Sequence, residues 1–283
     1  MIILVTGLLP FDSGKTWLSV AITREAKRKG LKAKIFKPIA GHNAWGQFKT
    51  VIESIKRRYL ICEDALIYQT YLGENDLTKI NPVDLLLAPP SIEHCKSLNN
   101  FMALLTDTLK QVVCARLTRH NGKTIHYLVH DHIEVTAEPL KSWLKKLAIR
   151  LDPHPISTSI NDVIALLEGN DVDQELYEHL KGYSEEHDIV IVESFNNAAI
   201  PFTSMLNFDI DEVLVALPLH VLVLDSKIFM HNAKQRLMNM GFKGLETDKV
   251  IENLNFKAIF NLKPAPSISD FDVSEITKYI IRK

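Results

Sequence analysis

Short apolar runs and helical spacings alternate at the start of the chain. Residues 1–5, MIILV, are almost entirely apolar, which is typical of a strand buried on both faces of a parallel sheet. Apolar residues then recur at helical spacing after Thr16, until the cations of KRKG and Gly30 indicate a helix C-terminus. A second apolar run covers residues 31–39. Strand, helix and strand in this order predict a parallel, right-handed βαβ unit.

Apolar runs that alternate with a helical spacing occur again in the C-terminal third of the chain. Three more apolar runs predict buried strands at 188–194, 220–225 and 257–261, with a helix between the last two. The chain therefore predicts an α/β fold: a doubly wound, mainly parallel sheet with helices on both faces. In such a sheet the ligand binds beyond the carboxyl ends of the strands. Four polar residues follow these strands in the sequence: Lys37, Glu193, Asp225 and Asn261.

The middle of the chain predicts a β-hairpin and two helices. Asn121-Gly122 separates two alternating segments, near 112–119 and 124–133, and this dipeptide is a strong signal for a two-residue hairpin turn. An amphipathic helix is expected over 137–151, and another from Ser159 to a stop at Gly169.

Three histidines of the second hairpin strand, His126, His130 and His132, recur at period two and are expected on one face. Such imidazoles can converge on zinc. Exposed or hydrogen-bonded histidines are the favoured alternative, because no cysteine or carboxylate stands at a supporting spacing.

Composition narrows the class of protein. Of the 283 residues, 46% are apolar and 24% charged, which is ordinary for a soluble globular protein. The formal net charge of −1 supplies no overall field for nucleic acid or an acidic membrane, and short basic runs such as Lys56–Arg58 are normally solvated. Three cysteines without a C-x-x-C pair favour a reducing compartment, so a cytoplasmic protein is expected. We expect no signal peptide, because no basic residue precedes the apolar N-terminal run and Pro10 and Asp12 interrupt it early. We expect no membrane span, because no uninterrupted apolar run is long enough to cross a bilayer.

The segment VTGLLPFDSGKT carries the clearest candidate chemistry. It departs from the usual phosphate-binding pattern, since six residues instead of four separate Gly7 from Gly14. The required context is nevertheless present: a strand, a turn, and a helix whose positive N-terminal end can meet phosphates. Lys15 is expected to reach the β- and γ-phosphates and the Thr16 hydroxyl to hold Mg²⁺. A surface turn with an incidental Gly-Lys-Thr is the alternative.

Two further candidates stand at strand ends. Glu193 closes IVIVE, where a carboxylate can face a metal or a reacting phosphate, or can simply be a solvated strand terminus. Asn261 opens NLKPAP, whose prolines stop the strand and leave an amide able to pair with the edge of a base.

Together these stretches resemble dethiobiotin synthetase, an ATPase of the P-loop NTPase class. The matching segments are VTGLLPFDSGKT, IFKPIAG, EDALIYQTYLGENDLTKINPVDLLLAPPS, DIVIVES and NLKPAP, which span 1–95 and about 186–265. The resemblance implies ATP and Mg²⁺ as cofactors. It implies these nucleotide-binding residues: Ser13, Gly14, Lys15, Thr16, Trp17, Asn261 and Pro264. It also implies that Thr16, Asp64 and Glu193 share Mg²⁺, and that Lys15 and Lys37 are catalytic.

The resemblance further implies an enzyme that phosphorylates a carbamate, carboxylate or similar small acceptor, and a homodimer. The net charge and the cysteines add the expectation of a cytoplasmic protein without nucleic-acid or membrane partners. The whole chain, 1–283, is then a single domain with an addition at about 96–185. The departures fall on the acceptor side: LLPF in the loop, Gly41 in place of a serine, and SFNNAAIPF after Glu193. The alternative is a nucleotide-dependent switch that controls dimerisation or a protein partner. Lys37 favours the enzyme, because a switch has less use for a second lysine.

Overall fold

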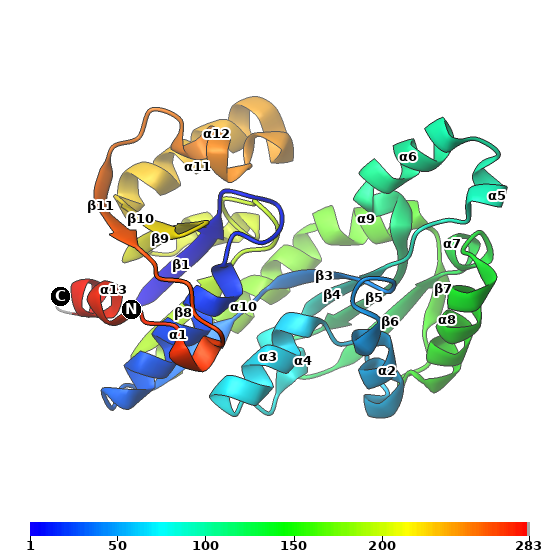
Figure 1. Ribbon diagram of the computed structural model, residues 1–283, viewed down its shortest axis with the longest axis horizontal. Coiled ribbons are helices and arrows are strands. Elements are labelled where there is room, and N and C mark those ends of the chain that lie inside the picture. Colours follow the sequence, from blue (N-terminus) through cyan, green and yellow to red (C-terminus); the bar gives the residue numbers. More distant parts are fainter. Residues whose placement is uncertain (282–283) are drawn as a thin grey trace. The chain divides into compact units, whose positions relative to one another are not determined.

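The computed structural model describes residues 1–281, and the chain divides into two compact units (Figure 1). Unit 1 contains residues 1–38, 67–75 and the chain from 176 onward, and unit 2 contains 39–66 and 76–175. Each unit has a sheet of its own. The sequence predicts one domain with an addition at about 96–185, whereas the second compact unit already begins at residue 39.

Unit 1 is built on a six-stranded mixed sheet in the order β11-β10-β9-β1-β8-β2. Its strands are β1 (Ile2–Gly7), β2 (Ala33–Phe36), β8 (Ile189–Glu193), β9 (Glu212–Leu217), β10 (His220–Leu224) and β11 (Phe256–Asn261). β1 pairs in parallel with β8 and β9, and β2 pairs in parallel with β8. β10 is antiparallel to both β9 and β11.

Helices cover both sides of this sheet (Figure 1). Ile3 and Val5 of β1 pack in one apolar cluster with Leu18 and Ile22 of α1 (Lys15–Arg28). Thr6, on the opposite face of β1, instead meets Thr247 of α12 (Thr247–Ile251), with 2.7 Å between the two hydroxyl oxygens. β1 therefore lies between two layers of helices, which explains the apolar run Ile2–Val5. Burial of each such Leu or Ile side chain stabilises the fold by about 1.5–3 kcal/mol.

The other helical segments with residues in unit 1 are α3 (Glu63–Leu72), α10 (Asn170–Glu186), η2 (Thr203–Asn207), α11 (Ser226–Met240), η3 (Gly241–Gly244), α12 (Thr247–Ile251), η4 (Ile268–Asp270) and α13 (Ser274–Ile280). The predicted end of α1 is confirmed, because Lys27 and Arg28 occupy its last turn and Gly30 follows with a left-handed φ of 83°.

The predicted parallel βαβ unit is present, because β1 and β2 both pair in parallel with β8, which lies between them. β9 was not expected, and the predicted place of Asp225 is wrong. Because β10 runs against β9, Asp225 stands at the opposite edge of the sheet from Glu193. There it caps α11 by accepting from the backbone N–H groups of Lys227 and Ile228. Asn261 does lie at the same edge as Glu193, because β11 reverses direction again relative to β10.

Unit 2 contains a second mixed sheet in the order β3-β4-β5-β6-β7. Its strands are β3 (Ile39–Asn43), β4 (Val83–Leu87), β5 (Val112–Thr118), β6 (Thr124–Val129) and β7 (Ile156–Thr158). The predicted antiparallel pairing of β5 with β6 is confirmed. The predicted two-residue turn is wrong, because the Arg119 N–H donates to the Lys123 carbonyl oxygen around a longer loop, and Gly122 has a left-handed φ of 88° while Asn121 does not have a positive φ.

The remaining helices are α2 (Phe48–Arg57), α4 (Leu77–Ile80), α5 (Ile92–Cys95), α6 (Leu98–Thr106), η1 (Thr108–Gln111), α7 (His130–Glu134), α8 (Glu138–Arg150) and α9 (Ile160–Glu168). α8 and α9 confirm the two predicted helices. Ser159 and Asp162 form a capping box at the start of α9, and Gly169 follows its end.

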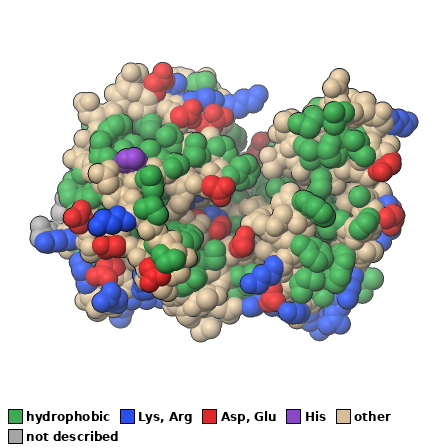
Figure 2. Space-filling view, viewed as in Figure 1, with side chains coloured by type: hydrophobic (Ala, Val, Ile, Leu, Met, Phe, Trp, Pro, Cys, Tyr) green, Lys and Arg blue, Asp and Glu red, His purple; other side chains and the backbone are tan. Residues whose placement is uncertain are grey.

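α6 differs from the longer helices because none of its side chains is buried. Figure 2 shows hydrophobic side chains gathered over this helix. Leu98 is 62% exposed and Met102 is 51% exposed. From residue 1 to residue 281, no helix combines the length and apolar character that a membrane crossing needs.

Candidate phosphate-binding site

The loop between β1 and α1 closes over Gly7. A Cβ atom on Gly7 would collide with Ser13 Oγ and with Lys15 Nζ. Gly14 stands at the N-cap of α1 with a left-handed φ of 88°, which favours glycine. The local geometry therefore requires both glycines of the predicted loop, although their spacing is unusual.

The N-terminal end of α1 is open to an anion. Gly14 provides no side-chain cap, and the first turn of this 14-residue helix contains no acidic residue. The N–H groups of a first turn have no partner within their own helix, and the helix dipole makes this end positive. Lys15 is buried next to it, and its Nζ donates to Ser13 Oγ at 2.9 Å. This arrangement fits a phosphate group.

Glu193 connects three separate segments of unit 1. It ends β8 opposite Val5 of β1, and its side chain is fully buried. Its Oε1 accepts from Thr16 Oγ1 at 2.8 Å and from Lys37 Nζ at 2.8 Å. Its Oε2 accepts from the Tyr68 hydroxyl at 2.7 Å. A buried carboxylate needs such partners, and loss of one partner from a buried ion pair costs roughly 3–5 kcal/mol.

The structure thus brings several predicted residues together. Ser13 contacts Lys15, while Thr16 and Lys37 share one oxygen of Glu193, across separations of up to 177 residues in sequence. Trp17 is half-buried, and its ring lies edge-on to Phe271 at 5.7 Å between centroids. The predicted contact of Trp17 with the nucleotide stays a prediction.

Tyr68 is a site residue that the sequence did not indicate. It is fully buried on α3 and donates to Glu193 across 125 positions. The segment EDALIYQTYL contains two tyrosines, Tyr68 and Tyr71, and nothing in its pattern separates a hydroxyl that meets a carboxylate from one that does not.

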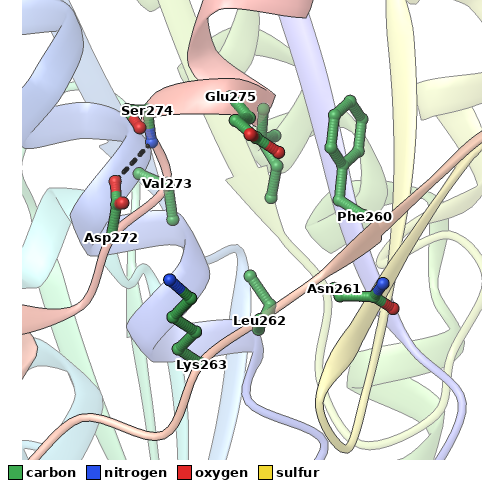
Figure 3. A pocket seen from close by; sticks show the side chains of 9 residues that line it. Phe260, Asn261, Leu262, Lys263, Asp272, Val273, Ser274 and Glu275 are labelled. Atoms are coloured by element: carbon green, nitrogen blue, oxygen red, sulfur yellow. Dashed lines mark hydrogen bonds between the residues drawn. The ribbon is translucent and has the colours of Figure 1, made fainter.

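Asn261 lines a pocket of about 130 Å³ at the end of β11 (Figure 3), and Pro264 directly follows the lining residue Lys263 in the sequence. Asn261 and Lys263 line it from β11 and the following loop, and Asp272 and Ser274 line it from the start of α13. In Figure 3 the Lys263 side chain extends toward Asp272. In the sheet β11 is three strands from β1, a separation of roughly 14 Å between these two strands. Adenine recognition by Asn261 and Pro264 stays a prediction.

Asp64 belongs to unit 2, where it stands in the first turn of α3. Burial raises the pKa of Asp84, and the negative charge of Asp64 contributes to that rise. Burial lowers the pKa of His42, and the charges of Asp84 and Asp64 partly oppose this shift. The predicted role of Asp64 as a Mg²⁺ ligand beside Thr16 and Glu193 stays a prediction.

Unit 2 also contains a buried polar row that the sequence did not reveal. Asp84, Arg116 and His126 are direct neighbours across β4, β5 and β6. The Arg116 guanidinium donates to the backbone oxygens of Leu60 and Asn81 at 2.7 Å each, and lies 3.7 Å from Asp84 Oδ2. The row is desolvated, because all three side chains are at most 1% exposed.

The predicted histidine face is wrong. β6 ends at Val129, so His130 and His132 belong to the short helix α7 and do not share a strand face with His126. His132 Nδ1 lies 2.7 Å from the Val112 carbonyl oxygen. No group of three or more His, Cys, Asp and Glu side chains within residues 1–281 is arranged to hold a metal ion. These histidines therefore give no support to a zinc site.

No known family model matches this chain, and none of the curated proteins or solved structures compared with it is significantly similar. The resemblance to dethiobiotin synthetase consequently rests on the quoted motifs alone, and the roles it implies stay predictions.

Proposed function

We propose that this protein binds ATP with Mg²⁺ at the β1–α1 loop and transfers the γ-phosphate to a small acceptor. The observation that carries the proposal is the contact of Thr16 and Lys37 with the same oxygen of buried Glu193, beside the open N-terminus of α1. This combines an anion-binding helix end with a carboxylate, a hydroxyl and two lysines.

The side chains fit both cofactors. Mg²⁺ prefers hard oxygen ligands and commonly takes only one or two from protein carboxylates, the rest being waters and phosphates. Thr16 Oγ1 and Glu193 Oε1, 2.8 Å apart, are such oxygens and would hold it. The bound cation would neutralise charge on the β- and γ-phosphates.

The chain's own groups would bind and orient the reactants. The first-turn N–H groups of α1 would hold phosphate oxygens, and Lys15 would leave Ser13 Oγ to reach the β- and γ-phosphates. Lys37, at the carboxyl end of β2, would stabilise negative charge that develops on the transferred group. Such catalysis needs alignment and charge neutralisation more than covalent participation by the protein.

The finer parts of the proposal come from the resemblance. They are a P-loop NTPase fold with the β5–β6 hairpin and its helices as an addition, a carbamate or carboxylate acceptor of the dethiobiotin synthetase type, and a cytoplasmic homodimer. Lys37 supports an enzyme over a nucleotide-dependent switch, because a switch has less use for a second lysine at the nucleotide.

The test is Lys15→Ala, measured by calorimetric titration with Mg·ATP. Loss of binding is expected, because Lys15 is the lysine next to the open helix end. Lys29→Ala is the matched control, since Lys29 is exposed at the other end of α1, and it should bind as the wild type does. Equal affinities for the Lys15→Ala and wild-type proteins would overturn the loop assignment.

A second measurement separates the enzyme from the switch. Phosphate release is followed with ATP alone and then with diaminopelargonic acid and bicarbonate, the acceptor pair of dethiobiotin synthetase. Stimulation supports the enzyme of this type. Nucleotide binding without stimulation favours either the switch or a different acceptor.

A further inference from the structure

The two carboxylate oxygens of Glu193 have different partners. Oε1 accepts from Thr16 and Lys37, the residues of the proposed nucleotide site, whereas Oε2 accepts from Tyr68 at 2.7 Å. All four residues belong to unit 1. The terminal torsion of a glutamate is broad and roughly two-fold, so the carboxylate has no strong orientation of its own. Its orientation depends on what holds each oxygen.

We propose that Tyr68 is a positioning residue, which fixes Oε2 and so presents Oε1 to the cation. The inference rests on the proposed function and adds to it the residue that orients the metal-binding carboxylate. A hydroxyl that donates to a carboxylate forms a short, charge-assisted bond, about twice as strong as a neutral one. Tyr68 is fully buried, so water does not compete for this bond.

The segment that carries Tyr68 is itself held to unit 1. Glu74, just beyond the end of α3, accepts from Lys27 of α1 at 3.0 Å and from Lys34 of β2 at 2.7 Å. Lys27 also donates to the carbonyl oxygen of Leu72 at 3.1 Å. These contacts tie residues 67–75 to the same helix and strand that lead to Thr16 and Lys37. Tyr68 therefore acts from a fixed support, as a positioning residue requires.

The test compares Tyr68→Phe with the wild type by calorimetric titration with adenylyl imidodiphosphate, a non-hydrolysable ATP analogue, in Mg²⁺ and in EDTA. Loss of a hydrogen bond to a charged group predicts affinity about tenfold weaker in Mg²⁺. Affinity in EDTA should stay unchanged, because Glu193 then contributes no metal contact, and a general loss of structure would lower both affinities. Tyr71→Phe, on the same helix, is the matched control and should change neither.

Removal of the Tyr68 hydroxyl leaves the buried Glu193 carboxylate with one hydrogen-bond partner fewer, which can destabilise the folded protein. A second pair of variants avoids this destabilisation. Glu193→Gln and the double variant Glu193→Gln/Tyr68→Phe contain no carboxylate at this position. The proposal expects equal affinities in Mg²⁺ for these two proteins, because Tyr68 acts only through Glu193. A further loss in the double variant would overturn it.

The outcomes separate the inference from the proposed function. If the wild type binds the analogue in neither buffer, the proposed function fails, and the positioning role fails with it. If the wild type binds with a clear Mg²⁺ dependence that Tyr68→Phe retains in full, the positioning role alone is overturned. A tenfold loss confined to Mg²⁺ supports both.

Discussion

Protonation of His126 should destabilise the protein in mild acid. The ring is fully buried on β6, with Nδ1 3.0 Å from the Pro153 carbonyl oxygen. Its Nε2 accepts from the Leu60 N–H at 3.4 Å. These contacts describe a neutral ring that donates through Nδ1. Protonation of Nε2 would place a second proton against the Leu60 N–H and a charge beside Arg116.

The magnitude follows from the pKa. Burial lowers the pKa of His126 from 6.5 to about 4, and the positive charge of Arg116 adds to this effect, while the Pro153 carbonyl opposes it. Between these values the unfolded chain binds the proton and the folded chain does not. The unfolding free energy should therefore fall as pH decreases through this window, by at most about 1.4 kcal/mol per pH unit and about 3 kcal/mol in total.

The assay is urea unfolding at pH 7.5, 6.5, 5.5 and 4.5 for the wild type and for His126→Asn. The asparagine amide keeps a donor for Pro153 and does not titrate, and acidic groups common to both proteins cancel in the difference. The wild type should lose about 1–3 kcal/mol more than the variant between pH 7.5 and 4.5. His154→Asn is the control, because His154 is exposed and close in sequence, and it should follow the wild type.

Equal pH dependence in the wild type and His126→Asn would refute the reasoning. It would mean that the folded protein accepts the proton on His126 as readily as the unfolded chain does. A proton NMR titration of the ring resonances provides an independent check, since it should show that His126 stays neutral well below pH 6.

Two further predictions concern packing. Gly7→Ala should lower the unfolding free energy by about 1–3 kcal/mol in urea titrations and weaken ATP binding, because the new Cβ would displace Ser13 and Lys15. Gly46→Ala is the control, since a Cβ there meets nothing within 4 Å. Equal stability of the two variants would contradict the loop geometry. On the exposed helix α6, Leu98→Gln and Met102→Gln should each change the unfolding free energy by no more than about 0.5 kcal/mol. Leu144→Ala in the unit 2 core is the comparison and should lower it by about 2–5 kcal/mol. A loss above about 2 kcal/mol at Leu98 would show that α6 is buried in solution.

The sequence predicted well what depends on local contacts. β1, α1 and the stop at Gly30 follow from apolar spacing and helix capping within one short, continuous segment. The antiparallel pairing of β5 with β6 follows from two alternating segments on either side of a short loop, in which Gly122 adopts a left-handed φ. These features form wherever the segment is placed, so the rest of the chain adds little information about them.

Strand partners were less predictable, because they depend on distant segments. β8 lies between β1 and β2, although all of unit 2 separates it from both strands in the sequence. β9 and β10 form a tight antiparallel pair joined through Leu219, which has a left-handed φ of 64°. This reversal moved Asp225 to the edge of the sheet away from Glu193. Apolar runs alone do not specify strand direction.

Glu193 shows why part of the site could be predicted and part could not. A carboxylate at the end of an apolar strand must find donors. The motifs indicated Thr16 and Lys37 as residues of the same site, and the structure shows that both donate to this carboxylate. A single lysine leaves the second oxygen of a buried carboxylate unsatisfied, at a cost of about 1–3 kcal/mol. Tyr68 removes that cost by donating to Oε2. Any donor that reaches Oε2 would have the same effect, so the sequence pattern could not identify Tyr68 as the residue that does. Because Thr16, Lys37 and Tyr68 together hold both oxygens, the carboxylate is already oriented before a nucleotide arrives.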